Sequence, residues 1–183
     1  MYKRREFEGP FGSSMEYPFG DYTYPPRLIR RARSRISIFA IDPNIVFWYS
    51  SPECINALRQ AHARGVEIRM IAGRLMPFDS FGNTGRPEVL ELADEGTIQL
   101  YLRNPRFSRS EYLDDERDYI IVDERIIAIA GQPNLEQHAT EWNVDEDPRM
   151  NYLIADFESY IKGNRTKSYD PSRAMELLFP KEG

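Results

Sequence analysis

The chain has 183 residues and a net charge of −5, with 41% apolar and 29% charged residues. This length suits one domain, and the apolar content suffices for a buried core, which excludes a wholly disordered chain. No apolar run approaches the ~20 residues of a membrane-spanning helix, no signal peptide is visible, and the single cysteine, Cys54, excludes an internal disulfide. We therefore expect a soluble cytoplasmic protein, and the acidic balance argues against one that coats nucleic acid over its whole surface.

The amino-terminal segment, residues 1–26, is rich in glycine, proline and aromatic residues. Glycine and proline oppose long helices and strands, whereas a merely flexible tail seldom carries so many aromatic side chains. We expect this segment to be an arm that packs on its own domain or on a partner. A domain over residues 27–162 follows, and then a carboxyl-terminal extension over residues 163–183.

Regular patterns begin after Pro26. Helices are expected over residues 27–33, 52–64, 87–95, 150–162 and 171–179, and strands over residues 35–41, 66–72, 97–102, 119–123 and 126–130. Ser51 and Gly65 have the positions of a helix cap and a helix end. Alternating strands and helices predict an α/β fold, and the tight hairpin after Asp123 makes the sheet mixed, with helices flanking it.

Three segments carry a resemblance to a known family: ALRQAHARGVEIRMI (residues 57–71), GTIQLYL (96–102) and YIIVDERIIAIAGQPN (119–134). Their order resembles one half of a phospholipase D-like domain, over residues 27–161. That family carries the motifs H-x-K-x4-D and G-S-x-N. The resemblance places Asp123, Gly131 and Asn134 at the family's aspartate, glycine and asparagine, and Asn143 and Asp145 at a following N-x-E.

The two residues that carry the family's chemistry are replaced. The family's histidine attacks phosphorus and its lysine holds the phosphate oxygens, but the matching positions here are Glu116 and Asp118, and Gln132 replaces the serine. We call the matched set the relic motif: Glu116, Asp118, Asp123, Gly131, Asn134, Asn143 and Asp145. Two carboxylates repel an anionic phosphodiester, so the resemblance implies a catalytically inactive phospholipase D-like protein without a cofactor. We expect Glu116, Asp123 and Asn134 to lie near one sheet edge.

No other residue replaces the missing nucleophile. His62 lies on a helix, where a solvated imidazole is the simpler interpretation, and Cys54 lies on the packing side of that helix as a buried, inert thiol. His138 follows the turn over residues 131–134 and could approach the relic motif, although a local structural role is favoured.

Charged residues gather in three places. An acidic segment runs over residues 111–124 as a solvated loop, a partner for basic groups, or, least favoured, a metal site. Three arginines entering it are anion-binding candidates: Arg103, Arg106 and Arg109. A second basic cluster comprises Arg27, Arg30, Arg31, Arg33 and Arg35. These arginines pair with the acidic segment, within the chain or across a dimer, or contact phosphate or nucleic acid.

The function predicted is a non-catalytic binding, regulatory or assembly module. A half-domain of this kind implies a homodimer through the relic-motif face, with the apolar residues 45–49 in the core, in the dimer contact or beside a ligand. A protein partner or an anionic ligand suits the module, and nucleic acid and a membrane surface stay open as partners. The alternative is a divergent metal-dependent phosphodiesterase or nuclease in which Glu116, Asp118 and Asp123 converge on an ion.

Overall fold

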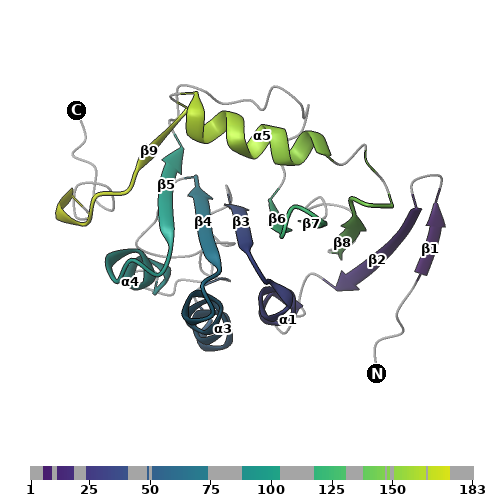
Figure 1. Cartoon of the computed structure of the whole chain (residues 1–183), viewed down its shortest axis with the longest axis horizontal. Coiled ribbons are helices and arrows are strands. Elements are labelled where there is room, and N and C mark those ends of the chain that lie inside the picture. The colour runs from purple at the N-terminus through teal and green to yellow at the C-terminus, as the bar shows by residue number, and fades with distance from the viewer. Residues whose placement is uncertain are drawn as a thin grey trace.

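A single mixed sheet organises the protein (Figure 1). The computed structural model describes residues 6–9, 12–18, 24–40, 49, 51–73, 88–103, 118–130, 138–146, 148, 151–163 and 165–173. In these ranges the nine strands have the order β1-β2-β8-β7-β6-β3-β4-β5-β9. The strands are β1 (Glu6–Gly9), β2 (Gly12–Pro18), β3 (Arg35–Ala40), β4 (Glu67–Ala72), β5 (Gln99–Arg103), β6 (Tyr119–Val122), β7 (Ile126–Ala130), β8 (His138–Asn143) and β9 (Thr166–Ser168). The helices are α1 (Tyr24–Arg31), α3 (Pro52–Ala63), α4 (Val89–Asp94), α5 (Asn151–Lys162) and the 3-10 helix η2 (Pro171–Arg173).

Strand direction defines two rims of the sheet that matter for the site. β3, β4 and β5 are parallel, and all other pairs are antiparallel, which confirms the mixed α/β sheet. We call the rim where the three parallel strands end, at Ala40, Ala72 and Arg103, the carboxyl rim. The opposite rim, where they begin, is the amino rim.

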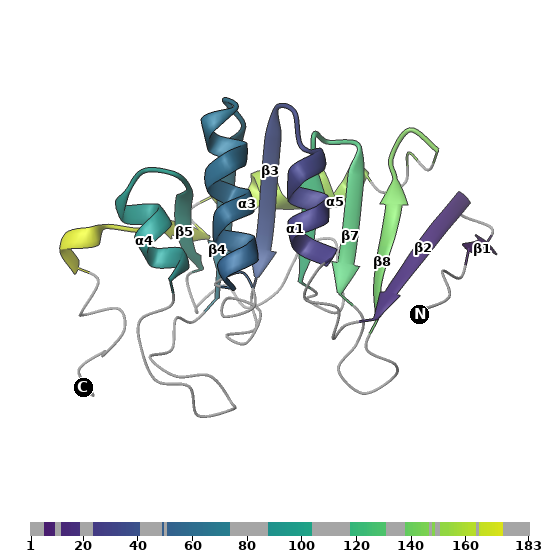
Figure 2. The same cartoon turned by 90° about the horizontal axis from the view of Figure 1, so that it is seen from below.

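Helices cover both faces of the sheet. α1, α3 and α4 lie side by side on one face, and α5 crosses the other (Figures 1 and 2). Alternate residues of the central strands therefore enter two cores: Ile36 and Ile38 of β3 pack toward α1 and α3, whereas Phe39 packs toward α5. This double burial explains why the strands are almost continuously apolar.

Local signals set the limits of α3 as the sequence predicts. The Ser51 hydroxyl accepts a hydrogen bond from the Cys54 N–H (3.3 Å), and Pro52 opens the helix. Gly65, at φ 84°, follows the helix end in the left-handed conformation that glycine adopts without a Cβ penalty.

The described part of the arm packs on its own domain, which is one of the two expected arrangements, but it does so through strands that were not expected. The glycine- and proline-rich arm forms strands: β2 pairs with β8 of its own chain, from Met15 opposite Glu141 to Pro18 opposite His138, and β1 pairs with β2. The glycines and prolines bound these strands instead of preventing them. β8 and β9 were likewise not expected. Of the helix expected over residues 171–179, η2 covers the first three residues and the remainder lies outside the described part.

None of the described helices combines the length and apolar character that crossing a bilayer requires.

Candidate functional site

The structure divides the relic motif between the two rims. Asp118 directly precedes β6, and Tyr119 lies opposite Phe39, so Asp118 is at the carboxyl rim. Val122, the last residue of β6, lies opposite Ile36, so Asp123, which follows it, is at the amino rim. Five residues at ~3.3 Å each separate the two by roughly 16 Å along the strand.

The remaining motif positions follow the same division. Asn143 pairs with Ile126 at the amino rim, and Asp145 lies in the adjoining turn. Ala130, which leads to Gly131, pairs with Ala139 at the carboxyl rim. Glu116, Gly131 and Asn134 lie outside the described residues. The expected grouping of Asp123 with Glu116 and Asn134 thus stays a prediction, and among the described positions Asp123 is at the opposite rim from Asp118 and Ala130.

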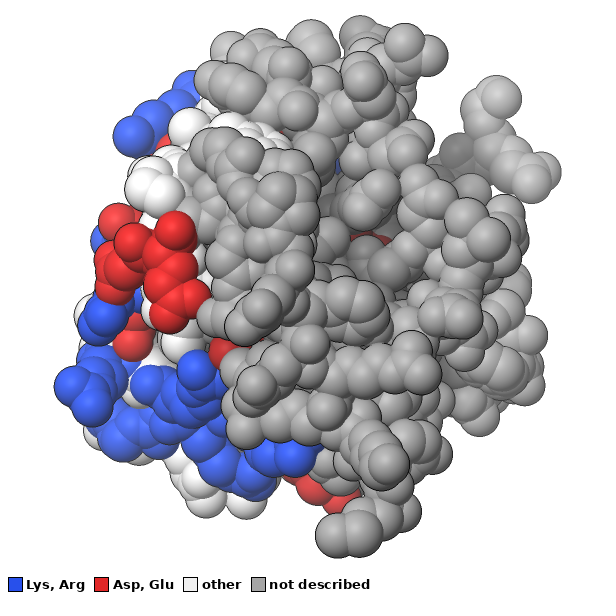
Figure 3. Space-filling model, turned by 90° about the vertical axis from the view of Figure 1, so that its right-hand side faces the viewer, with Lys and Arg blue, Asp and Glu red and all other residues white. Residues whose placement is uncertain are grey.

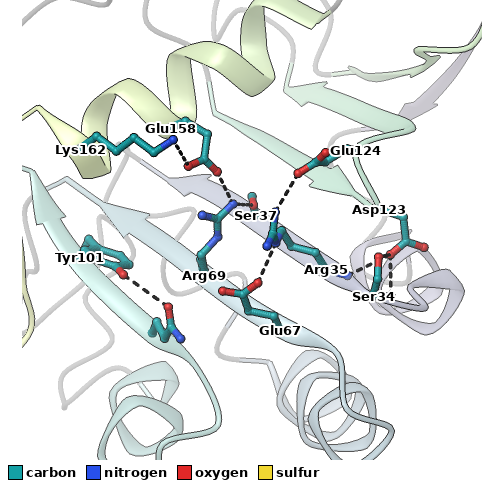
Figure 4. A network of polar contacts seen from close by, with 11 residues as sticks. Ser34, Arg35, Ser37, Glu67, Arg69, Tyr101, Asp123, Glu124, Glu158 and Lys162 are labelled. Atoms are coloured by element: carbon teal, nitrogen blue, oxygen red, sulfur yellow. Dashed lines mark hydrogen bonds and ion pairs between the residues drawn. The ribbon is translucent and has the colours of Figure 1, made fainter.

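Asp123 binds the turn between α1 and β3 (Figure 4). Its carboxylate accepts hydrogen bonds from the N–H groups of Arg33 (2.9 Å), Ser34 (2.8 Å) and Arg35 (3.0 Å) and from the Ser34 hydroxyl (2.9 Å). Its own N–H donates to the Arg35 carbonyl (2.8 Å). Burial raises the pKa of this carboxyl, but the three N–H groups and the Ser34 hydroxyl outweigh burial and hold the pKa below the ordinary 3.8.

The turn that carries Asp123 has an unfavourable backbone. Asp123 and Glu124 have φ of 54° and 55°, a left-handed conformation that short polar side chains tolerate and that glutamate does not favour. The Arg125 N–H donates to the Val122 carbonyl (3.0 Å) and closes the turn. The contacts of Asp123 hold this backbone in place.

Ion pairs extend the network along the amino rim (Figure 4). Arg35 contacts Glu124 (2.8 Å) and Glu67 (2.7 Å). Arg125 contacts Asp145 (2.6 Å) from the neighbouring turn. These side chains are about half exposed, so each pair adds about 1 kcal/mol or less to the free energy of unfolding.

Asn143 organises the turn after β8. Its side-chain oxygen accepts a hydrogen bond from the Asp145 N–H (3.0 Å), and its side-chain amide donates to Glu146 (3.3 Å). Asp145 in turn contacts Arg125. Asp123, Asn143 and Asp145 thus hold turns, and a structural role accounts for all three.

The carboxyl rim contains buried tyrosines and a buried thiol. Tyr49 is 3% exposed, and Cys54, in the first turn of α3, is fully buried in the core between the helices and the sheet. Burial raises the pKa of Tyr49, and the nearby Cys54 and Asp118 raise it further. Burial also raises the pKa of Cys54 to about 11, so the thiol is protonated near neutrality and is not an activated nucleophile. Tyr49 is the one described residue of segment 45–49, and it packs in the core.

A buried carboxylate lies on the α5 face of the sheet. Asp156 is 0% exposed and accepts a hydrogen bond from the Tyr119 hydroxyl (3.3 Å). Tyr119 stacks on Phe39 with 4.9 Å between ring centroids, and Tyr160 contacts the same ring. Burial raises the pKa of Tyr119, and Asp156 raises it further.

A second buried polar group lies on the same face, nearer the amino rim (Figure 4). Arg69 is 8% exposed and donates to Glu158 (2.6 Å) and to Ser37 (3.1 Å). Its Nε has no hydrogen-bond partner among the described residues. Burial raises the pKa of Glu158, but Arg69 and then Lys162 outweigh burial and lower it overall.

Neither Asp156 nor Arg69 was predicted as a site residue, although the sequence around each carries a signal. Asp156 interrupts the inward row of α5, between Leu153 and Tyr160, and Arg69 interrupts an apolar strand. A charged residue among buried apolar positions is buried only when it has a polar partner, and both Asp156 and Arg69 form hydrogen bonds.

The described basic candidates lie in different places. Arg103 ends β5 at the carboxyl rim, half-buried, while Arg106 and Arg109 lie outside the described residues. In the second basic cluster, Arg31 contacts Glu141 (2.8 Å) and Arg35 contacts Glu124. Pairing within the chain is therefore established for two of the five arginines.

The two histidines lie on different elements, one on a helix and one on a strand. His62 is exposed at the end of α3. His138 is the first residue of β8, at the carboxyl rim. Within the described ranges, no three His, Cys, Asp or Glu side chains are arranged to hold a metal ion. Most of the acidic segment, residues 111–117, falls outside those ranges.

Comparison with solved structures identifies the fold. Nuc from Salmonella typhimurium, a phospholipase D family member, matches 85% of this chain and 95% of its own chain at 20% identity, with a TM-score of 0.53. NucT from Helicobacter pylori matches 85% of this chain and 98% of its own at 10% identity, with a TM-score of 0.58. TrmBL2, an archaeal chromatin protein with a novel mode of DNA binding, matches 85% of this chain and 54% of its own at 16% identity, with a TM-score of 0.52.

No protein-family model and no curated protein matches the sequence. The structural matches show that the chain has a phospholipase D-like α/β fold. Sequence identities of 20% or less show a shared fold alone, so the activity has to be inferred from the residues of this chain.

Replacing Asp123 tests its structural role. Asp123→Asn keeps the tolerance for positive φ but removes the charge that four donors share, so we expect a loss of about 2–3 kcal/mol in the free energy of unfolding at pH 7. Because the folded pKa lies below 3.8, the wild-type advantage is complete above that pH and disappears as pH falls through the folded pKa. Urea denaturation between pH 7 and pH 2 measures both effects. Asp145→Asn, an exposed control, should cost less than about 1 kcal/mol; equal losses for the two variants would contradict this role.

Replacing Glu124 tests the strained turn. Glu124→Gly removes the Cβ that disfavours φ 55°, and the relief of about 1 kcal/mol should exceed the loss of the exposed pair with Arg35. Glu124→Ala loses the same pair and keeps the strain. Thermal denaturation should therefore rank glycine above wild type and alanine below it. A glycine variant no more stable than the alanine variant would refute strain at this position.

Proposed function

We propose that this protein is a non-catalytic phospholipase D-like module that binds a partner or anionic ligand without cleaving phosphodiesters. The resemblance gives the catalytic histidine and lysine adjacent places at the start of one strand, and at this position the described residue is Asp118. A carboxylate there repels a phosphodiester and the charge that develops in its transition state. Glu116, two residues earlier, adds a second negative charge.

The observation that carries the proposal is the separation of the described histidines and lysines. His62 is on α3 and His138 on β8, whereas Lys162 ends α5 and Lys167 lies in β9. Five strands separate β8 from β9, and α3 lies on the opposite face of the sheet from α5. The described part of the chain therefore offers no histidine–lysine pair that could attack phosphorus and stabilise the leaving oxygen together.

Asp123 supports the same proposal. Its carboxylate oxygens accept hydrogen bonds from the α1–β3 turn at the amino rim, away from Asp118. An aspartate with this role is needed for the fold whether or not the protein turns over a substrate. Retention of the motif's aspartate is thus compatible with loss of the chemistry.

Turnover assays test the absence of catalysis. The protein is incubated with bis(p-nitrophenyl) phosphate, labelled DNA and phosphatidylcholine vesicles, each with EDTA, Mg²⁺ or Mn²⁺. We expect no turnover above that of Asp118→Asn and no phosphorylated histidine. EDTA-resistant turnover that His138→Ala abolishes would make His138 the nucleophile. Metal-dependent turnover that Asp118→Asn abolishes would establish the alternative, a divergent metal-dependent phosphodiesterase.

The proposal includes a homodimer through the part of the relic-motif face that carries Asp118, because a single half-domain resembles one of two paired halves. β2 of the arm pairs with β8 of its own chain, so the arm need not bridge two copies. Light scattering after gel filtration should give about twice the 21.4 kDa chain mass. A monomer at a chain concentration of ~100 μM, which limits the free energy of dimerisation to about 5.5 kcal/mol, would reject the dimer and leave the turnover result unaffected.

A further inference from the structure

The exposed residues of α1, among those whose burial the structure describes, are all arginines. Its apolar residues, Leu28 and Ile29, are 1% and 0% exposed and fix the helix to the core. The exposed positions in and just after the helix are Arg27, Arg30, Arg31, Arg33 and Ser34. Arg27 and Arg30 are three residues apart and share one side of the helix, and Arg33 follows two residues after the helix ends.

α3 adds a fifth guanidinium to this face. Arg64, exposed at the end of α3, donates to the carbonyls of Ala32 (3.2 Å) and Arg30 (3.5 Å). We call Arg27, Arg30, Arg31, Arg33 and Arg64 the basic surface. Figure 3 shows Lys and Arg side chains gathered in one continuous group low on the described surface, with an acidic group above it. On a chain of net charge −5, this is a local concentration of positive charge.

The carboxylates next to the basic surface anchor it from behind. Glu141, 5% exposed, binds Arg31, whose side chain stays 47% exposed. Asp123 is occupied by the backbone of residues 33–35. No carboxylate of the described chain forms an ion pair with Arg30, Arg33 or Arg64. Those three guanidinium groups therefore present their charge to solvent.

We propose that the basic surface binds the phosphate backbone of nucleic acid. Guanidinium groups donate paired hydrogen bonds to phosphate oxygens, and several on one helix face suit a row of phosphates. The inference goes beyond the proposed function and does not depend on it. The surface lies on the α1 side of the amino rim, whereas Asp118 is at the carboxyl rim.

The composition of the surface favours nucleic acid over other polyanions. A membrane-surface helix inserts apolar side chains between lipids, but the apolar residues of α1 point into the core. A protein interface needs a desolvated apolar centre, which the exposed arginines do not provide. Binding to a phosphate backbone needs charge alone and does not require apolar contact.

Fluorescence anisotropy with the full chain tests the proposal, using a labelled 25-base-pair DNA duplex, the same sequence as single-stranded DNA, and an RNA duplex. Four phosphate contacts give a slope of about −3.6 for the logarithm of the binding constant against the logarithm of the salt concentration. Affinity should therefore fall roughly 150-fold between ~50 and ~200 mM salt. The double variant Arg30→Gln, Arg33→Gln should bind roughly tenfold more weakly and halve the slope to about −1.8. Arg33→Gln alone should lower the slope by about 0.9, which keeps the test available if the double variant is unstable.

Arg59→Gln is the matched control. Arg59 is also an exposed helical arginine, but it pairs with Glu95 on the side of α3 toward α4. The control should bind each nucleic acid as the wild type does, and the three probes distinguish DNA from RNA as the preferred source of phosphate. Equal binding by the double variant and the control, or binding without salt dependence, would overturn the proposal. So would binding confined to phosphatidylserine vesicles, or self-association lost with Arg30 and Arg33 but without nucleic-acid binding.

Discussion

The hydrogen bonds of the Asp123 carboxylate join two turns that are distant in the sequence. Residues 33–35 begin the central strand β3, and Asp123 ends its neighbour β6, so this contact fixes how the two strands start and finish against each other. It also holds two consecutive residues at positive φ. The position of α1 depends on the same carboxylate, because the turn that it binds is the turn that directs α1 onto the sheet.

The two faces of the sheet are stabilised by different kinds of interaction. The face beneath α1 and α3 is an apolar core, whereas the face beneath α5 includes Asp156 and Arg69 with their hydrogen-bond partners. Burying such groups costs free energy unless they are paired, so they add less stability than apolar residues would and specify one placement of α5 more narrowly. The buried charged groups that restrict helix placement thus lie on the α5 face of the sheet.

The sequence predicted those features of the fold that depend on residues close together in the chain. Ser51 and Gly65 bound α3, the central strands are short runs rich in β-branched and aromatic residues, and the hairpin after Asp123 is where the spacing predicts it. The pairing of β2 with β8 was missed because its partners lie more than a hundred residues apart and no local pattern encodes them. The donors to Asp123 are equally remote. The separation of Asp118 from Asp123 could have been foreseen, since five residues of extended chain cannot bring two side chains to one site.

The outermost strands come from the first and last described segments. β1, with β2, covers β8, and β9 covers β5, so each inner neighbour has its backbone hydrogen bonds satisfied by a short piece of peripheral chain. Both pieces are brief and carry charged residues, a combination that discourages edge-to-edge stacking of molecules. A shortened recombinant version that lacks β9 would expose β5, which is longer and more apolar than β9, and one that lacks β1 and β2 would expose β8. The choice of expression boundaries therefore also affects how strongly the molecules aggregate.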